Sequence, residues 1–353
     1  MATEAAYGAA RERILHLCRG DIGSRELRIE LLDALRRVVG FDAYVWLLTD
    51  PETSVGSSPV ADVPFFPELS RGIRLKYTTA VNRWTNLQEP VQLLSVATRG
   101  DLHQSLMWRE LLCHYGVTDG ASAVFRDRFG CWSFLDLWRT EGRRPFQPAD
   151  VELVATIAAP VTEALRHSQA RTFAEHRDTP RVPPGPVVLL LSPDLAVRAQ
   201  TPSAQVYLRA LVPPAEGSAP VPAGAYNVAA QLLANEAGVD GNPPLARVHL
   251  ADGVWLTMKA ARLEGPRTDD GPDIAVSIEP SSASERASLF ARAYGLTRRE
   301  TELLTRLIAG ADTRDLARLM YVSENTVQDH LKSVFAKTGT RSRRTLLSLV
   351  LGR

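Results

Sequence analysis

The stretch from Leu296 to Arg344 constrains the fold most, because it carries three helix signatures within about 50 residues. Thr297 and Glu300 form a predicted capping box, in which a hydroxyl and a carboxylate satisfy free amides at a helix start. Asp312 and Ser323 are the predicted N-caps of two further helices. Apolar residues at helical spacing follow each cap, which predicts amphipathic helices. They are Leu303, Leu304, Leu307 and Ile308, then Leu316, Ala317 and Leu319, and finally Val327, Leu331, Val334 and Phe335.

The second and third of these helices are short and are joined by a tight turn at Met320-Tyr321-Val322. This arrangement describes a helix-turn-helix, in which the second helix can lie in the major groove of DNA. The exposed face of that helix is expected to carry amides, a carboxylate and a lysine, which can hydrogen-bond to base edges. Its residues are Asn325, Gln328, Asp329, Lys332, Ser333 and Ala336. Helix spacing alone leaves open a small helical bundle with a solvated polar face.

Charge is divided unevenly along the chain. Residues 289–353 contain 12 Lys and Arg against 6 Asp and Glu, a net charge of +6, whereas the remainder carries 29 against 34, a net charge of −5. A concentrated basic surface is what contact with DNA phosphates requires. The candidate phosphate contacts are Arg298, Arg299, Ser323, Lys337, Arg341, Arg343 and Arg344.

The same segment resembles the LuxR-type helix-turn-helix of bacterial transcription regulators. The resemblance rests on marks in consistent order: Leu296-Thr297-x-Arg299-Glu300, Gly310, Leu316-Ala317, Val322-Ser323, Asn325-Thr326-Val327, His330, Lys337 and Arg341-Ser342-Arg343. It implies that Thr326 and Val327 lie at the entry of the recognition helix. With the polar face, it gives these base-facing candidates: Asn325, Thr326, Val327, Gln328, Asp329 and Lys332.

Two positions depart from that family's pattern. The family often has a basic residue where Gln328 stands, and Asp329 is unusual in a groove because its charge repels phosphates. Asp329 can accept a hydrogen bond from a cytosine amino group, or it can pair with Lys332. These departures leave the operator sequence open rather than the DNA-binding role. His330 is expected to be a packed helix residue and not a base reader.

Length and composition predict a globular protein of two or three domains. The chain has 353 residues, of which 45% are hydrophobic and 23% charged. Its three widely spaced cysteines, Cys18, Cys113 and Cys131, argue against a disulfide framework and for a reducing compartment, and no pair has metal-ligand spacing. We see neither a signal-peptide pattern nor an apolar run that could cross a bilayer. The sequence therefore predicts a cytoplasmic protein with no membrane partner, no metal and no cofactor.

The region before residue 170 is predicted to be an α+β domain with an antiparallel sheet. Its closing part, from Gly130 to Arg139 and then through Pro145-Phe146 and Ala149-Asp150, resembles the end of a GAF sensory domain. The resemblance implies a GAF-like α/β sensory domain over residues 1–170, an arrangement similar to that of actinobacterial regulators with LuxR-type C-termini. The expected elements are a helix capped by Ser24 and ended by Gly40, a strand over 41–49, a loop over 54–67, a hairpin of 121–128 with 131–139, and a helix over 149–169 with Pro160 inside it.

Five of the six tryptophans fall in this region. An aromatic-lined pocket for a small effector is one interpretation, and an ordinary core whose indoles bridge interior and surface is the other. For any single tryptophan the core is favoured, and for the group the two interpretations are balanced. The effector-pocket candidates are Trp46, Trp84, Trp108, Trp132 and Trp138.

Residues 171–186 are polar and then proline-rich, which predicts an extended linker. The next unit, residues 187–280, resembles a PAS fold by the order of its expected elements, and Asp252-Gly253 is a two-residue hairpin signal within it. Residues 281–353 complete the chain as a connector helix and the LuxR-type domain. The predicted fold class is thus multidomain α+β: a GAF-like α/β domain, a PAS-like α+β domain and an all-α four-helix helix-turn-helix domain.

No catalytic arrangement stands out in the sequence. It has no Gly-x-x-x-x-Gly-Lys-Ser/Thr run, no Gly-x-Ser-x-Gly elbow and no His-Glu-x-x-His pair, and its first region lacks the βα repeat of a phosphoacceptor domain. We therefore expect a protein that is not an enzyme and has no catalytic residues. The leading hypothesis is a sequence-specific DNA-binding transcription regulator whose N-terminal domains sense a small molecule or partner.

The partners follow from that hypothesis. Because one short recognition helix binds weakly, we expect a homodimer on paired half-sites of double-stranded DNA. The closing helix, 342–351, and the helix over 149–169 are candidate dimer faces, although the apolar stripe of the former also suits packing within its own domain. A small-molecule effector and RNA polymerase are further candidate partners.

Two rival hypotheses belong to other classes. The first is a protein-interaction adaptor whose helix-turn-helix no longer binds DNA. Asp329 is its best support, because its charge repels phosphates. A ligand-processing enzyme with a regulatory tail is disfavoured by the missing catalytic arrangement.

Overall fold

The computed structural model describes residues 3–175, 186–211, 220–251, 254–264 and 271–352. Its contacts group into two compact units: the first comprises Met1–Leu165, Pro183–Val248 and Thr257–Glu279, and the second comprises Arg166–Val182, His249–Leu256 and Pro280–Arg353. No helix in the described ranges is long and apolar enough to cross a membrane.

A five-stranded antiparallel sheet organises the N-terminal part of the first unit, with strand order β2-β1-β5-β4-β3. The predicted hairpin is confirmed as β4 and β5, and the predicted strand as β1. The structure also places a strand in the segment 54–67, for which the sequence predicts a loop. The bounds are β1 Ala43–Thr49, β2 Gly56–Asp62, β3 Val91–Leu93, β4 Val117–Asp127 and β5 Gly130–Thr140.

This unexpected strand, β2, lies at an edge of the sheet. Its sequence, GSSPVAD, contains serines and a proline, which in isolation indicate a turn. An edge strand tolerates Pro59 because one side of its backbone needs no partner. Pairing with β1 therefore decides the conformation of this segment, and that pairing is not visible in the local pattern.

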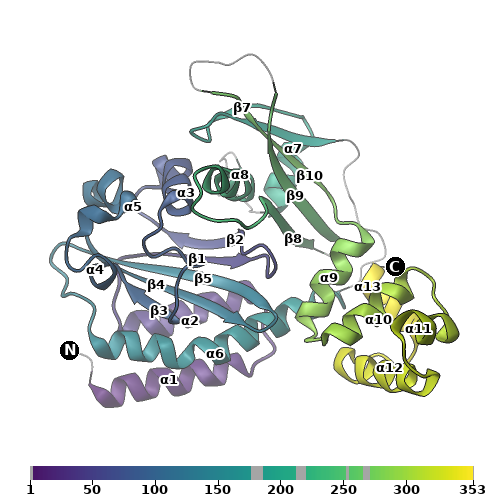
Figure 1. Cartoon of the computed structure of the whole chain (residues 1–353). Coiled ribbons are helices and arrows are strands. Elements are labelled where there is room, and N and C mark those ends of the chain that lie inside the picture. Colours follow the sequence, from purple (N-terminus) through teal and green to yellow (C-terminus); the bar gives the residue numbers. More distant parts are fainter. Residues whose placement is uncertain (1–2, 176–185, 212–219, 252–253, 265–270, 353) are drawn as a thin grey trace. The chain divides into compact units, whose positions relative to one another are not determined.

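Helices cover both faces of this sheet (Figure 1). Helices α1, α2 and α6 lie on one side, and α3, α5 and α8 on the other. Helix α2 buries Leu27, Leu31, Leu32 and Leu35. Ser24 is its first helical residue and not its cap, because the cap is Gly23, which provides no side-chain hydrogen bond. Helix α6 continues through Pro160. The bounds are α1 Glu4–Cys18, α2 Ser24–Val38, α3 Leu69–Thr78, α4 Leu94–Ala97, α5 Leu106–Glu110 and α6 Pro148–Arg171.

A second five-stranded sheet follows, with strand order β7-β6-β10-β9-β8. Numbered from its own first strand, this order is the same as that of the first sheet. Strands β6 to β10 and helices α7 and α8 lie within residues 187–280, whereas the hairpin signal at 252–253 and most of the linker, 176–185, lie outside the described residues. The bounds are β6 Val187–Leu191, β7 Val197–Gln200, α7 Ala204–Leu211, α8 Ala223–Glu236, β8 Leu245–Ala251, β9 Val254–Arg262 and β10 Ile274–Pro280.

Helix α8 joins the two sheets within the first unit, because it packs against α3 and β2. Two ion pairs reinforce this junction. Arg83 Nη2 lies 2.7 Å from Asp240 Oδ2. Arg247 donates two hydrogen bonds to the Asp50 carboxylate, from Nε and from Nη2, both at 2.7 Å. The two sheets therefore belong to one packed body, although local sequence patterns suggest two separate modules.

The C-terminal part of the second unit is a helical domain with all three predicted caps in place. Thr297 forms a capping box with Glu300, and Asp312 and Ser323 each accept a hydrogen bond from the backbone amide three residues on. Tyr321 ends α11 in the left-handed conformation. The bounds are α9 Ala283–Ala293, α10 Arg298–Ile308, α11 Thr313–Met320, α12 Glu324–Thr338 and α13 Arg343–Leu351.

Candidate functional site

Helix α12 is positioned by its cap and by its apolar stripe. The Ser323 hydroxyl accepts from the Thr326 amide at 3.1 Å and thereby fixes the first turn. Val327, Leu331 and Val334 are all buried, and α12 packs against both α10 and α11. Because one side of the helix is anchored in this way, the opposite side faces solvent.

The exposed side of α12 carries four of the predicted base-facing residues, namely Asn325, Gln328, Asp329 and Lys332. Lys332 Nζ lies 3.4 Å from Asp329 Oδ1, and both side chains are about three-quarters exposed, at 78% and 75%. A pair so exposed holds its members weakly. Both side chains are therefore available to a partner.

The prediction that Val327 faces bases is wrong. Its side chain is fully buried at 0% exposure, because it belongs to the apolar stripe that anchors α12. Thr326 is half-buried, and its hydroxyl lies 2.9 Å from that of Ser323. His330 is also half-buried. Thr326 and Val327 in the first turn therefore serve the fold, whereas Asn325 and Gln328 lie on the exposed side of the helix.

The predicted phosphate contacts differ in their exposure and in their partners within the domain, where Arg299 pairs with Glu302 and Ser323 caps α12. Arg298, Arg299, Ser323, Arg341 and Arg344 are exposed. Two others are held within the domain. Arg343 donates to the Thr313 hydroxyl at 2.8 Å, and Lys337 donates to the Glu300 carboxylate at 2.6 Å. Lys337 therefore forms an ion pair within the domain while its side chain stays one-third exposed, at 33%.

Glu300 is the hub that ties α10 to α12. It is buried, with 3% exposure. Its Oε2 accepts from the Thr297 amide and from Lys337 Nζ, both at 2.6 Å, and its Oε1 accepts from the Ser333 hydroxyl at 2.6 Å. Burial by itself raises the pKa of this carboxyl, but the hydrogen bonds from Lys337, Ser333 and Thr297 outweigh burial and lower the pKa to about 2.

We expect Glu300→Gln to lower the free energy of unfolding of the helix-turn-helix domain by about 2 kcal/mol at pH 7, because it removes a buried charge that accepts three hydrogen bonds. A carboxyl with a lowered pKa stabilises the fold above its ordinary pKa of 4.5, and this stabilisation is lost as the pH falls toward 2. The difference between wild type and variant should therefore shrink over that range. Hydrogen exchange of the α10 and α12 amides at several pH values measures it.

Glu302→Gln is the matched control, since Glu302 lies on the same helix but forms exposed pairs with Arg299 and Arg306. Its effect should stay below about 1 kcal/mol. An equal loss in both variants would show that Glu300 has no special role.

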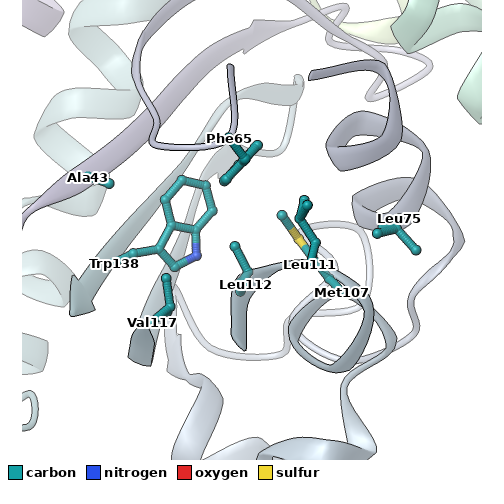
Figure 2. Close-up of a cluster of buried hydrophobic side chains, with 8 residues drawn as sticks. All are labelled: Ala43, Phe65, Leu75, Met107, Leu111, Leu112, Val117 and Trp138. Carbon is teal, nitrogen blue, oxygen red and sulfur yellow. The ribbon is translucent and has the colours of Figure 1, made fainter. Parts of the chain in front are cut away.

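The first unit contains a cavity of about 740 Å³ between its first sheet, α3 and α8. Figure 2 shows the adjoining buried cluster, in which Trp138 points toward Phe65, Leu111 and Met107. Phe65, Met107 and Trp138 also line the cavity, so one wall of it is continuous with the core. The polar members of the lining include Lys76, Asp136 and Asn227.

Of the five tryptophans named as candidates for an effector pocket, Trp138 lines this cavity. The other four donate their indole N–H to partners inside the domain, and they therefore serve its core and not this cavity. Trp46 donates to the Ser133 hydroxyl, Trp84 to the Ser54 carbonyl, Trp108 to the Val117 carbonyl and Trp132 to Asp127 Oδ1, at 2.6 to 2.9 Å.

Sequence reasoning missed Asp136 and Asn227. Asp136 lies between Leu135 and Leu137 in the strand sequence GCWSFLDLWRT, and a carboxylate between apolar residues of a buried strand is a signal that could have pointed to it. Asn227 offered no comparable signal, because its position beside the cavity depends on how α8 packs. Within the described ranges, no group of three or more metal-ligating side chains could hold a metal ion.

The short helix pair, its capped second helix with a polar exposed face and its basic charge together define a helix-turn-helix DNA-binding domain. Residues 295–350 match the family described as "Bacterial regulatory proteins, luxR family", so this domain is of the LuxR type. The match covers the C-terminal domain only.

Curated relatives match the same region. The CsgBAC operon transcriptional regulatory protein of Escherichia coli is 42% identical over 53 residues, which are 15% of this chain and 24% of that protein. The "Probable HTH-type transcriptional regulator GfsR" of Streptomyces halstedii is 35% identical over 71 residues, 20% of this chain and 29% of that protein. The chain thus spans about a quarter of the length of the curated relatives that it matches.

Among solved structures, E. coli SdiA aligns over 98% of both chains with 11% identity and a TM-score of 0.36. The bacteriophytochrome RpBphP3 of R. palustris aligns over 88% of this chain and 76% of its own, with 14% identity and a TM-score of 0.34. At these scores neither alignment defines a shared fold.

Proposed function

We propose that this protein is a sequence-specific DNA-binding transcription regulator. The observation that carries the proposal is α12: a capped, anchored helix in a LuxR-type domain with Asn325, Gln328, Asp329 and Lys332 on its exposed side. Amides, a carboxylate and a lysine are side chains that read base edges in the major groove. The exposed arginines Arg298, Arg299, Arg341 and Arg344 supply phosphate contacts that position the helix.

The regulator acts as a homodimer on paired half-sites in this proposal, because one short recognition helix gives little affinity and two gain by being joined. Leu346 and Val350 of α13 are fully buried in their own domain, which leaves less of that helix for a partner copy than its sequence suggests. Helix α6 remains the other candidate face. RNA polymerase would be the next partner on the promoter, in the bacterial cytoplasm where the DNA lies.

The N-terminal domains are the sensory part in this proposal, GAF-like over residues 1–170 and PAS-like over 187–280. Their two sheets share one strand order, which supports two modules of one general type. The cavity of about 740 Å³ supports a small-molecule effector, since pockets for such ligands fall in this size range.

The test is selection of genomic fragments by the full-length protein, followed by sequencing of the retained DNA at moderate salt. An enriched inverted repeat with half-sites about one helical turn apart is the expected result. Exposed Asp329 also favours the adaptor hypothesis, since a carboxylate repels phosphates. If neither the full chain nor residues 289–353 retain DNA, the adaptor replaces the regulator.

Lys332→Ala should weaken binding to the selected operator several-fold and shift its sequence preference, because a side chain on the readable face is lost. Titrations by fluorescence anisotropy at several salt concentrations measure affinity and salt dependence. The matched control is Lys259→Ala, which removes a lysine from strand β9, outside the helix-turn-helix. Equal behaviour of the two variants would remove Lys332 from the DNA contacts.

A further inference from the structure

Asp136 on β5 is a buried carboxylate with one satisfied oxygen. Lys76 Nζ on α3 donates to its Oδ1 at 2.9 Å, and the Ser122 hydroxyl on β4 donates to the same Oδ1 at 2.5 Å. Its Oδ2 is buried without a hydrogen-bond partner from the described part of the chain, and the residue is 2% exposed. Buried polar groups are almost always paired, so an unpaired carboxylate oxygen calls for a reason.

Asn227 on α8 has an unpaired hydrogen-bond donor, whereas Asp136 has an unpaired acceptor. It is 1% exposed, and its Nδ2 is buried with no partner among the residues that the structure describes. Asp136 and Asn227 line the same cavity, although one lies on the first sheet and the other on the helix that precedes the second sheet's strand β8. Two walls of this cavity therefore each contain a residue with an unpaired buried polar atom, an acceptor on Asp136 and a donor on Asn227.

The remaining chemistry of the lining limits what can occupy it. Lys76 and Asp136 neutralise each other at 2.9 Å, so the interior carries no net charge from this pair. Much of the rest is apolar or aromatic. Ligand pockets commonly combine such an apolar lining with a few placed polar groups that fix orientation. The apolar lining comprises, among others, Val45, Leu47, Val60, Phe65, Phe134 and Trp138.

We propose that this cavity binds an uncharged, mainly apolar molecule that carries one N–H or O–H donor and one carbonyl acceptor, and that this molecule bridges the two sheets' domains. The donor binds Asp136 Oδ2, and the acceptor binds Asn227 Nδ2. The inference rests on the proposed function, in that the N-terminal domains sense a small molecule, and it adds the ligand's chemistry and its bridging position.

A ligand in this position would stabilise the packing of α8 on the first domain. Helix α8 is held to the first domain by its packing on α3 and by the Arg83–Asp240 pair just beyond its end. A ligand bonded to both Asp136 and Asn227 adds a contact to that junction, so it stabilises the docked arrangement over any arrangement in which α8 has moved away. By linkage, the free energy that favours docking equals the gain in ligand affinity on docking.

The test uses two matched probes and the full-length protein. 1-Naphthylacetamide is an uncharged flat apolar ring with a primary amide, and its N,N-dimethyl derivative keeps the carbonyl but has no donor. We expect the first to bind in ligand-observed NMR titrations and to slow hydrogen exchange in α3 and α8. The dimethyl derivative should bind at least fivefold more weakly. Equal affinity of the two probes, or no binding of either, would overturn the ligand class.

Asn227→Leu tests the bridge without risking the fold, because it replaces an unpaired buried amide by an apolar side chain of similar size. Its melting temperature without probe should be unchanged or raised, and its affinity for 1-naphthylacetamide should fall at least fivefold. A merely structural asparagine would instead lower the melting temperature. The control is Asn235→Ala on the same helix, which loses the hydrogen bond from Gln231 Nε2 but should bind the probe as wild type does.

The two proposals fail separately in these experiments. Unchanged probe binding by Asn227→Leu, or unchanged exchange in α8 on binding, would overturn the bridge while leaving fragment selection by the full-length protein intact. If neither the full chain nor residues 289–353 retain DNA while probe binding is normal, the DNA-reading function is overturned and the bridging ligand stays in place.

Discussion

Asp240→Asn is expected to lower the free energy of unfolding of the first unit by about 3 kcal/mol, because it leaves the buried Arg83 guanidinium without a negatively charged partner. Arg83 is 0% exposed, and its Nε and Nη2 lie 3.0 and 2.7 Å from Asp240 Oδ2. Gln231 Oε1 accepts from Nη2 at 2.8 Å, and the Tyr77 carbonyl accepts from Nη1. These neutral acceptors remain in the variant, but they cannot balance the charge.

The loss should concentrate at the junction of the two sheets, since Arg83 follows α3 and Asp240 follows α8. Hydrogen exchange of α3 and α8 in the full chain, together with thermal melting, measures it. The control is Asp62→Asn, because Asp62 lies 4.0 Å from Arg36 with both side chains well exposed, and such a pair contributes less than about 1 kcal/mol. If both variants lose a similar free energy of unfolding, then the buried Arg83 does not need the charge of Asp240.

Acid should act in the same direction as the substitution. Burial raises the pKa of Asp240, but the Asn242 amide, Arg83 and Thr85 outweigh it, and the pKa lies below its ordinary value of 3.8. A lowered carboxyl pKa means stability that is present above 3.8 and lost as the pH falls below it. The junction is therefore built for neutral pH, where both partners are charged.

The helix-turn-helix domain could be predicted from sequence because its determinants are local. Thr297, Asp312 and Ser323 each cap a helix through an amide three residues away, and the apolar spacing of α12 sets which side is buried. One of its predicted base contacts is wrong for a non-local reason. The sequence predicts Val327 on the base-facing side, but tertiary packing buries its side chain in the core of the domain.

The cavity could not be predicted in the same way, because its residues come from distant segments. Asp136 meets Lys76 across 60 positions of sequence, and Asn227 lines the same cavity from helix α8. The same holds for the tryptophans, for which the sequence leaves a pocket and an ordinary core equally open as a group. Trp46 donates its indole N–H to the Ser133 hydroxyl, 87 positions away. Composition shows that aromatic residues are abundant, but only packing decides which of them faces a cavity.

The contacts of Gly130, at the turn between β4 and β5, could not be predicted from the sequence either. They can be tested by substitution. Gly130 has a φ of 150°, and a Cβ placed there would lie 2.1 Å from the Pro51 carbonyl oxygen and 2.7 Å from Pro51 Cβ. That carbonyl accepts from the Cys131 amide at 3.2 Å. The adjacent Asp50 is in turn gripped by Arg247. The turn at Pro51 therefore has little freedom to retreat.

We accordingly expect Gly130→Ala to lower the free energy of unfolding by about 3 kcal/mol or more, since an unfavourable φ and a backbone clash add together. Gly142→Ala is the matched control: Gly142 has a φ of 86°, but a Cβ added there would meet no atom within 4 Å, so only the conformational cost of about 1 kcal/mol remains. Urea denaturation followed by circular dichroism and by hydrogen exchange of β1 and β5 compares the two. Equal losses of unfolding free energy would show that the Asp50-Pro51 turn moves away at little cost. The ion pair between Arg247 and Asp50 would then be too weak to fix the junction between the sheets.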